Sequence, residues 1–156
     1  MLREGIDWAY EQGITNGTSA TTFSPFDSVR RSQIIQMLWI YSGKPEPRTA
    51  THFDDVEATA WYYKALCWAD EIGLIQELFP VGTGSILRRT PEGKFCPNWL
   101  IENDIAIDAL SFLHHQQMPD AIQDGQIRTF ESCCQRVNFC HYLHYAHQLA
   151  SGTLAN

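Results

Sequence analysis

The sequence predicts an all-α fold in which helix–loop–helix units pack into one compact bundle. Several stretches carry apolar residues at helical spacing and end in glycine, which is typical of amphipathic helices with a defined stop. The chain also repeats itself, because residues 2–14 align with residues 62–74 and Trp8 falls on Trp68. A helical segment that recurs about 60 residues later indicates a bundle of related units.

The predicted helices follow the apolar periodicity along the chain. We expect them over residues 2–12, 29–42, 59–71 and 101–115, and from about 134 to 150. Gly13, Gly43 and Gly73 are expected to stop the first three, because glycine readily adopts the left-handed conformation that often ends a helix. Asp27 or Ser28 is expected to cap the start of the second helix.

Two further expectations concern the middle of the chain. The inward face of the third helix is expected to carry Trp61, Trp68 and Ile72. The glycine-containing stretch 76–94 is expected to form a loop.

The repeats divide the chain into three predicted units. Phe95-Cys96-Pro97 repeats the Phe-Ser-Pro of residues 23–25, and residues 136–139 resemble residues 31–34. The units are unit 1 at residues 1–47, truncated at its N-terminus, unit 2 at residues 48–118, and a degenerate unit 3 at residues 119–156.

Composition excludes several classes of function. The chain of 156 residues is 44% apolar and 19% charged, which is typical of a globular domain. A net charge of −7 argues against nucleic-acid binding through a basic face. We find no apolar run of the ~20 residues that a membrane span needs, and no basic segment followed by an apolar run at the N-terminus.

The five cysteines do not form a disulfide pattern. Their number is odd, and their spacing matches no secreted disulfide framework. We therefore expect reduced thiols, which favours a reducing compartment.

Residues 2–75 resemble the S-layer homology (SLH) domain, with a partial match over 95–115 and a weak one over 121–149. The family's first half reads Phe-Asp-Asp-Val at 53–56, Trp-Tyr-Tyr-Lys-Ala-Leu-Cys-Trp-Ala at 61–69 and Gly-Leu at 73–74. Its second half reads Gly-Ile-Thr-Asn-Gly at 13–17, Phe-Ser-Pro at 23–25 and Val-Arg-Arg-Ser-Gln at 29–33.

The resemblance implies both a fold and a function. Three SLH units assemble into a pseudo-threefold bundle that anchors bacterial surface proteins to secondary cell-wall polysaccharide, often pyruvylated, without catalysis or a cofactor. An arginine for the ketal carboxylate, helix N-terminal amides and aromatic contacts would hold the sugar. Carried onto this chain, the implied ligand-binding residues are Arg31, Gln33, Gly17, Asp55, Trp61 and Arg136.

The sequence departs from the family pattern at two helix starts. Arg30 replaces the threonine of the Thr-Arg-Ala-Glu/Gln motif, so half of its capping box is lost. Residues 102–105 read Glu-Asn-Asp-Ile and offer no arginine, so the groove of unit 2 is expected to be inactive.

Several alternatives stay open. The chain could instead be an acidic cytoplasmic adaptor or inhibitor, of a phage or mobile-element type, that binds a basic protein. It would be cytoplasmic if Met1 is the true start, and in the cell wall or outside the cell if it belongs to a longer exported protein. Asp54 and Asp55 could bind sugar hydroxyls or a cation, or could form a turn and cap the Trp61 helix.

The last helix carries a cysteine and two histidines that could in principle bind zinc. Cys140, His144 and His147 lie at helical spacing, and thiolate and imidazole are ligands that zinc prefers. The spacing matches no zinc-finger pattern, however, so the expectation is that the chain binds no metal.

Overall fold

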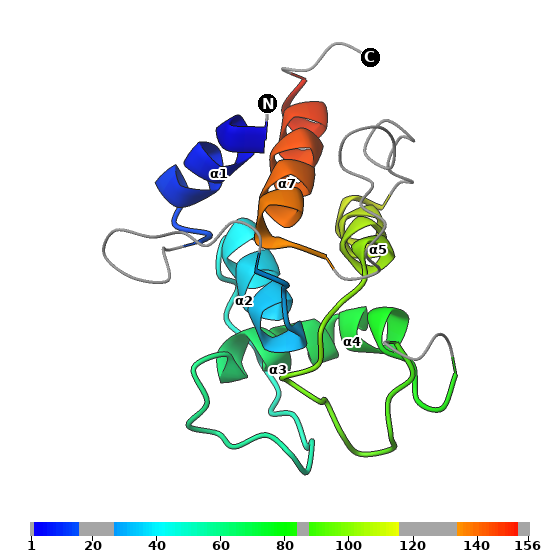
Figure 1. Ribbon diagram of the computed structural model, residues 1–156. Helices are drawn as coiled ribbons and strands as arrows, with labels where there is room; N and C mark the ends of the chain where they lie inside the picture. The colour runs from blue at the N-terminus through cyan, green and yellow to red at the C-terminus, as the bar shows by residue number, and fades with distance from the viewer. Residues whose placement is uncertain (1, 16–26, 84–87, 116–133, 153–156) are drawn as a thin grey trace. The chain divides into compact units, whose positions relative to one another are not determined.

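A computed structural model of the chain describes residues 2–15, 27–83, 88–115 and 134–152. Within these ranges the regular secondary structure is helical, with a few isolated bridges, which confirms the all-α prediction. The helices are α1 (Leu2–Glu11), α2 (Arg31–Tyr41), α3 (Tyr63–Glu71), α4 (Leu74–Leu78), α5 (Asn103–His114) and α7 (Arg136–Ser151) (Figure 1). No helix of this part of the chain is long and apolar enough to cross a membrane.

The structure divides into two compact units. The first, unit A, combines residues 1–29 with residues 102–156, and the second, unit B, comprises residues 30–101. These compact units do not coincide with the sequence repeats at 1–47, 48–118 and 119–156, which remain a prediction about how the sequence is related to itself.

Unit A is built on the contact between α1 and α7, which lie side by side (Figure 1). A Cβ atom added to Gly5 of α1 would lie 2.8 Å from the Cα of His141 and 3.1 Å from the carbonyl carbon of Cys140. The absence of a side chain at Gly5 therefore lets the two helix backbones approach closely. The third helix of this unit, α5, also packs against α7.

An extended segment precedes α2 and pairs within unit A. Ser28 forms an antiparallel bridge with Gln135. The Val29 N–H donates to the Cys134 carbonyl at 2.7 Å, and the Arg136 N–H donates to the Asp27 carbonyl at 3.0 Å. The expected helix cap at Asp27 or Ser28 is therefore wrong, because these residues pair with the segment before α7. Helix α2 begins at Arg31.

Unit B is built on α2 and α3, with α4 following α3 directly. Ile34, Ile35 and Leu38 of α2 are fully buried, as their helical spacing predicted. The predicted loop over 76–94 is wrong at its start, since Leu74–Leu78 forms α4.

The helix stops at Gly13 and Gly73 are confirmed. Gly13 has φ 72° after α1, and Gly73 has φ 85° after α3, a conformation that most side chains avoid. The two aligned segments therefore end in the same way. The start of α3 differs from its prediction, because Trp61 precedes the helix and is 62% exposed rather than inward. Ile72 caps the end of α3 and is also exposed.

Candidate ligand-binding site

Arg31 occupies the first turn of α2 and is fully buried in unit B. Its Nη1 donates to Thr90 Oγ1 at 2.8 Å and to the Phe95 carbonyl at 3.0 Å. Its Nη2 donates to the Arg88 carbonyl at 3.2 Å. The motif arginine thus ties the start of α2 to the segment 88–95.

Aromatic rings also contact the Arg31 guanidinium. Its Cζ lies 4.1 Å from the centroid of the Phe79 ring and 4.9 Å from that of Trp99, distances at which a cation is attracted to a ring face. Burial lowers the pKa of Arg31 to about 10, although the charges of Cys96 and Asp55 act in the opposite direction. The side chain therefore stays cationic at neutral pH.

The backbone amides at the start of α2 are bonded within unit B. The Arg31 N–H donates to the Trp99 carbonyl at 2.9 Å, and the Ser32 N–H donates to the Pro97 carbonyl at 3.0 Å. Gln33 Oε1 accepts from the Arg30 N–H at 2.9 Å. This bond is the half of the capping box that Arg30 allows, because a guanidinium has no acceptor to complete the other half.

Asp55 holds the backbone of the Phe95-Cys96 turn. Its Oδ1 accepts from the Phe95 N–H at 2.9 Å, and its Oδ2 accepts from the Cys96 N–H at 2.8 Å. Cys96 has φ 58°, which few non-glycine residues adopt. The alternative in which the aspartates cap the Trp61 helix is wrong, since Tyr62 takes the capping position of α3.

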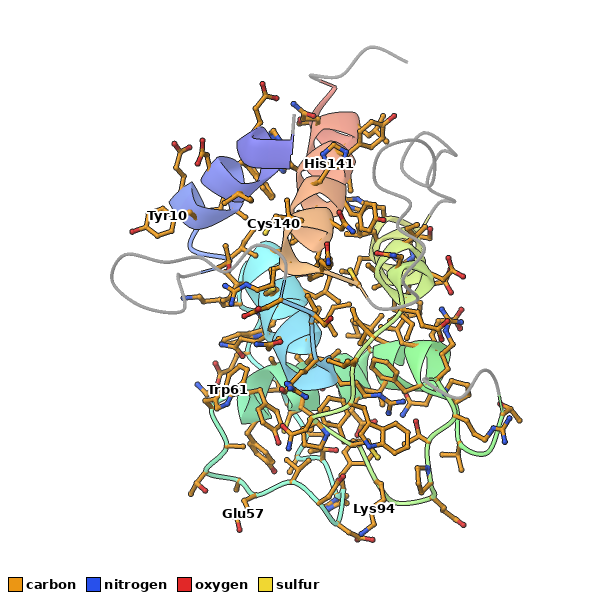
Figure 2. All side chains as sticks on the ribbon, in the orientation of Figure 1. Tyr10, Glu57, Trp61, Lys94, Cys140 and His141 are labelled. Atoms are coloured by element: carbon orange, nitrogen blue, oxygen red, sulfur yellow. The ribbon has the colours of Figure 1, made fainter. Side chains whose placement is uncertain are left out.

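The other predicted site residues differ in position and exposure. Trp61, labelled in Figure 2, presents an exposed indole. It packs edge-on against Tyr62, with ring centroids 5.1 Å apart. Arg136 is half-buried at the start of α7 in unit A, where its Nη2 donates to Thr15 Oγ1 at 2.9 Å. Gly17 lies outside the described residues. The structure therefore brings Arg31 and Asp55 together at the Phe95-Cys96 turn of unit B, whereas Gln33 bonds the backbone at the start of α2.

Asn103 takes the position in α5 that the motif arginine takes in α2 and α7. Its Oδ1 accepts a hydrogen bond from the Tyr142 hydroxyl at 3.4 Å within unit A. The structure therefore gives this asparagine an interhelical contact at the helix start where the sequence offers no arginine.

The candidate zinc ligands of α7 make other contacts. Cys140 is fully buried, and burial raises the pKa of its thiol to about 12, so that the thiolate a metal needs is disfavoured. The rings of His144 and His147 lie against Trp8, with centroids 5.1 Å and 5.2 Å from the indole. Among the described residues, no three His, Cys, Asp or Glu side chains are placed to hold a metal ion.

Sequence reasoning missed the partners that surround Arg31. Phe79, Thr90 and Trp99 come from parts of the chain about 50 to 70 residues away, and no local pattern signals their contact with a helix-start arginine. The repeated Phe-x-Pro was the available signal, since Phe95 accepts a bond from Arg31 through its carbonyl.

Comparison with known proteins identifies a family that part of this chain resembles. The model of the S-layer homology domain matches residues 1–35, a range that ends inside α2 and includes Arg31. An endoglucanase of Bacillus sp. (strain KSM-635) is 34% identical over 111 residues, which are 69% of this chain and 10% of that protein. The chain thus matches about a tenth of this relative's length. These similarities support a cell-wall-anchoring module, and we conclude that the chain carries S-layer homology domain sequence at residues 1–35.

Proposed function

We propose that this chain is a non-catalytic module that attaches a bacterial protein to a secondary cell-wall polysaccharide. The observation that carries the proposal is the S-layer homology match over residues 1–35, which includes the motif arginine at the start of α2. The proposal locates the chain at the cell wall and requires neither a cofactor nor a reaction.

The proposed ligand contacts are Arg31, Gln33, Gly17, Asp55, Trp61 and Arg136. An anionic sugar would bind through paired N–H donors of an arginine, since a guanidinium matches a carboxylate geometrically. Trp61, with its exposed ring, would stack on the sugar. Arg136 is the motif arginine that keeps some exposed surface. A polysaccharide could contact Arg31 directly only if the segment Arg88–Thr90 moved.

The test is sedimentation of the intact chain with purified, peptidoglycan-linked polysaccharide. We expect the chain to pellet with sacculi that retain the polysaccharide and to stay in solution with sacculi stripped of it. Arg136→Gln should weaken binding about tenfold, because it removes a charge-assisted hydrogen bond. Trp61→Ala should weaken it by a similar factor.

Matched controls separate binding from folding. Arg48→Gln changes an arginine that is 87% exposed and pairs with Glu71, and Tyr10→Ala changes an aromatic residue that is 63% exposed. Both should leave sedimentation unchanged. The sedimentation of Arg31→Ala must be compared with the thermal unfolding of the same variant, because loss of a buried arginine also lowers stability.

Two results would decide against the proposal. Failure of the intact chain to sediment with either kind of sacculi rules out wall attachment. Salt-sensitive binding of the intact chain to a basic protein would instead favour the acidic adaptor, which the net charge of −7 suits.

A further inference from the structure

A pocket of about 310 Å³ lies within unit B, and Trp61 is not among the residues that line it. Its walls are mostly apolar and include three phenylalanines, Phe53, Phe79 and Phe95; Ile75, Gln76, Pro80, Val81 and Lys94 complete the lining. This volume is at the lower end of the range for small-molecule sites. The pocket therefore suits a ligand group of about one ring.

The aromatic wall of the pocket is held in place from several sides. The Phe95 ring lies 6.0 Å from that of Phe53 and 6.3 Å from that of Phe79, measured between centroids. Phe79 and Phe95 are almost completely buried. The site is therefore formed before any ligand arrives, which reduces the ordering cost of binding.

Lys94 is the charged residue in the lining of this pocket. The Lys94 side chain, labelled in Figure 2, is 43% exposed. Its Nζ lies 3.7 Å from Asp54 Oδ2, which is longer than a good hydrogen bond. Arg31 does not line the pocket, but its guanidinium stacks on the Phe79 ring.

We propose that this pocket binds a small apolar group that carries a carboxylate, such as an arylalkyl carboxylic acid. The ring would lie against Phe53 and Phe79, and the carboxylate would pair with Lys94 in place of Asp54. None of the residues that line this pocket is among the proposed polysaccharide contacts, although Arg31 and Asp55 contact its wall residues Phe79 and Phe95 from behind. Apolar walls with one cation select an anionic amphiphile over a sugar, whose hydroxyls would be left without hydrogen-bond partners.

The experiment is a titration of the isotope-labelled intact chain with 3-phenylpropionate, followed by amide resonances in NMR. We expect saturable shifts at Ile75, Val81 and Lys94. The uncharged isostere 3-phenylpropionamide should bind about fivefold more weakly, since an exposed ion pair contributes at most ~1 kcal/mol.

Three variants sharpen the outcome. Lys94→Gln should abolish the preference for the acid over the amide. Lys64→Gln, which changes a lysine of α3 that pairs with Glu46, should preserve this preference. Val81→Trp should block both compounds, because Val81 is a 58% exposed residue of the pocket lining whose enlargement does not disturb the core. Absence of saturable shifts at the pocket, or equal affinity for acid and amide, would overturn the proposal.

Discussion

Two adjacent aspartates in the turn before α3 make different contacts. Asp55 accepts from the N–H groups of Phe95 and Cys96, whereas Asp54 makes a long ion pair with Lys94 at 3.7 Å. Asp55→Ala should lower the free energy of unfolding by about 2 kcal/mol, because it leaves two backbone donors without their charged acceptor. Asp54→Ala should lower it by ~0.5 kcal/mol or less.

Urea unfolding followed by circular dichroism measures both aspartate variants. The two substitutions delete the same chemical group at neighbouring positions, so each is the control for the other. Equal losses of stability would contradict the contacts assigned to Asp55.

The sequence predicted which residues carry the family motif but not what they touch. The Arg31 position follows from its place in the motif, whereas its burial does not, because arginine is rarely buried and no local pattern signals it. Burial is possible here since Thr90, Phe95 and Arg88 supply acceptors from a distant segment. The pairing of Asp55 with the Phe95-Cys96 turn is equally invisible in a linear pattern.

At the scale of helices, the crossing of α1 and α7 depends on Gly5. Gly5→Ala would place a Cβ 2.8 Å from the Cα of His141, a backbone atom that cannot rotate away. The clash should cost about 1–3 kcal/mol, more than the ~1 kcal/mol that alanine adds to helix propensity. Thermal unfolding measures the loss, and Glu11→Ala at the exposed end of α1 is the control. A stabilised Gly5→Ala protein would show that α1 and α7 lie farther apart.

The histidines of unit A predict that the packing of α7 becomes less stable at acidic pH. Burial lowers the pKa of His114, His141 and His144, although the charge of Glu4 raises that of the latter two. A histidine whose pKa is lower in the folded state binds protons more readily when unfolded. The stability that depends on the neutral form is therefore present above the usual histidine pKa of ~6.5 and is lost as the pH falls below it.

We accordingly expect the melting temperature to fall between about pH 7.5 and about pH 5.5. His144→Gln, which keeps a neutral side chain beside Trp8, should reduce the fall. His52→Gln in unit B changes an exposed histidine and should leave the fall in melting temperature unchanged. A melting temperature that rises on acidification would mean that a protonated His144 on the Trp8 ring is favoured as a cation.

Helix prediction from apolar spacing succeeded where glycine marks the end and failed where the start depends on distant pairing. Gly13 and Gly73 end their helices as expected. The start of α2 was placed too early because Ser28 pairs with Gln135, a contact that sequence spacing cannot indicate. The short helix α4 was missed because Gly73 both stops α3 and precedes the next helical turn.

At the scale of the whole molecule, the compact units and the sequence repeats make different predictions for fragments. Residues 30–101 contain α2, Arg31 and its acceptors Thr90, Phe95 and Arg88, so this fragment should be helical and unfold cooperatively. Residues 48–118 follow the repeat boundary but lose α2 and Arg31, and this fragment should stay largely unfolded. Circular dichroism and urea titration compare the two, and cooperative unfolding of 48–118 alone would favour the repeat as the folding unit.

The buried position of Arg31 affects how sequence searches are interpreted. An arginine that closes a turn by bonding three acceptors of its own chain is needed for folding, whether or not a ligand is present. Finding this residue in another sequence therefore indicates a folded unit. It does not by itself distinguish a domain that binds the polysaccharide from a related domain that no longer binds it. The positions whose identity can carry that distinction are Trp61, which is exposed, and Arg136, which is half-buried.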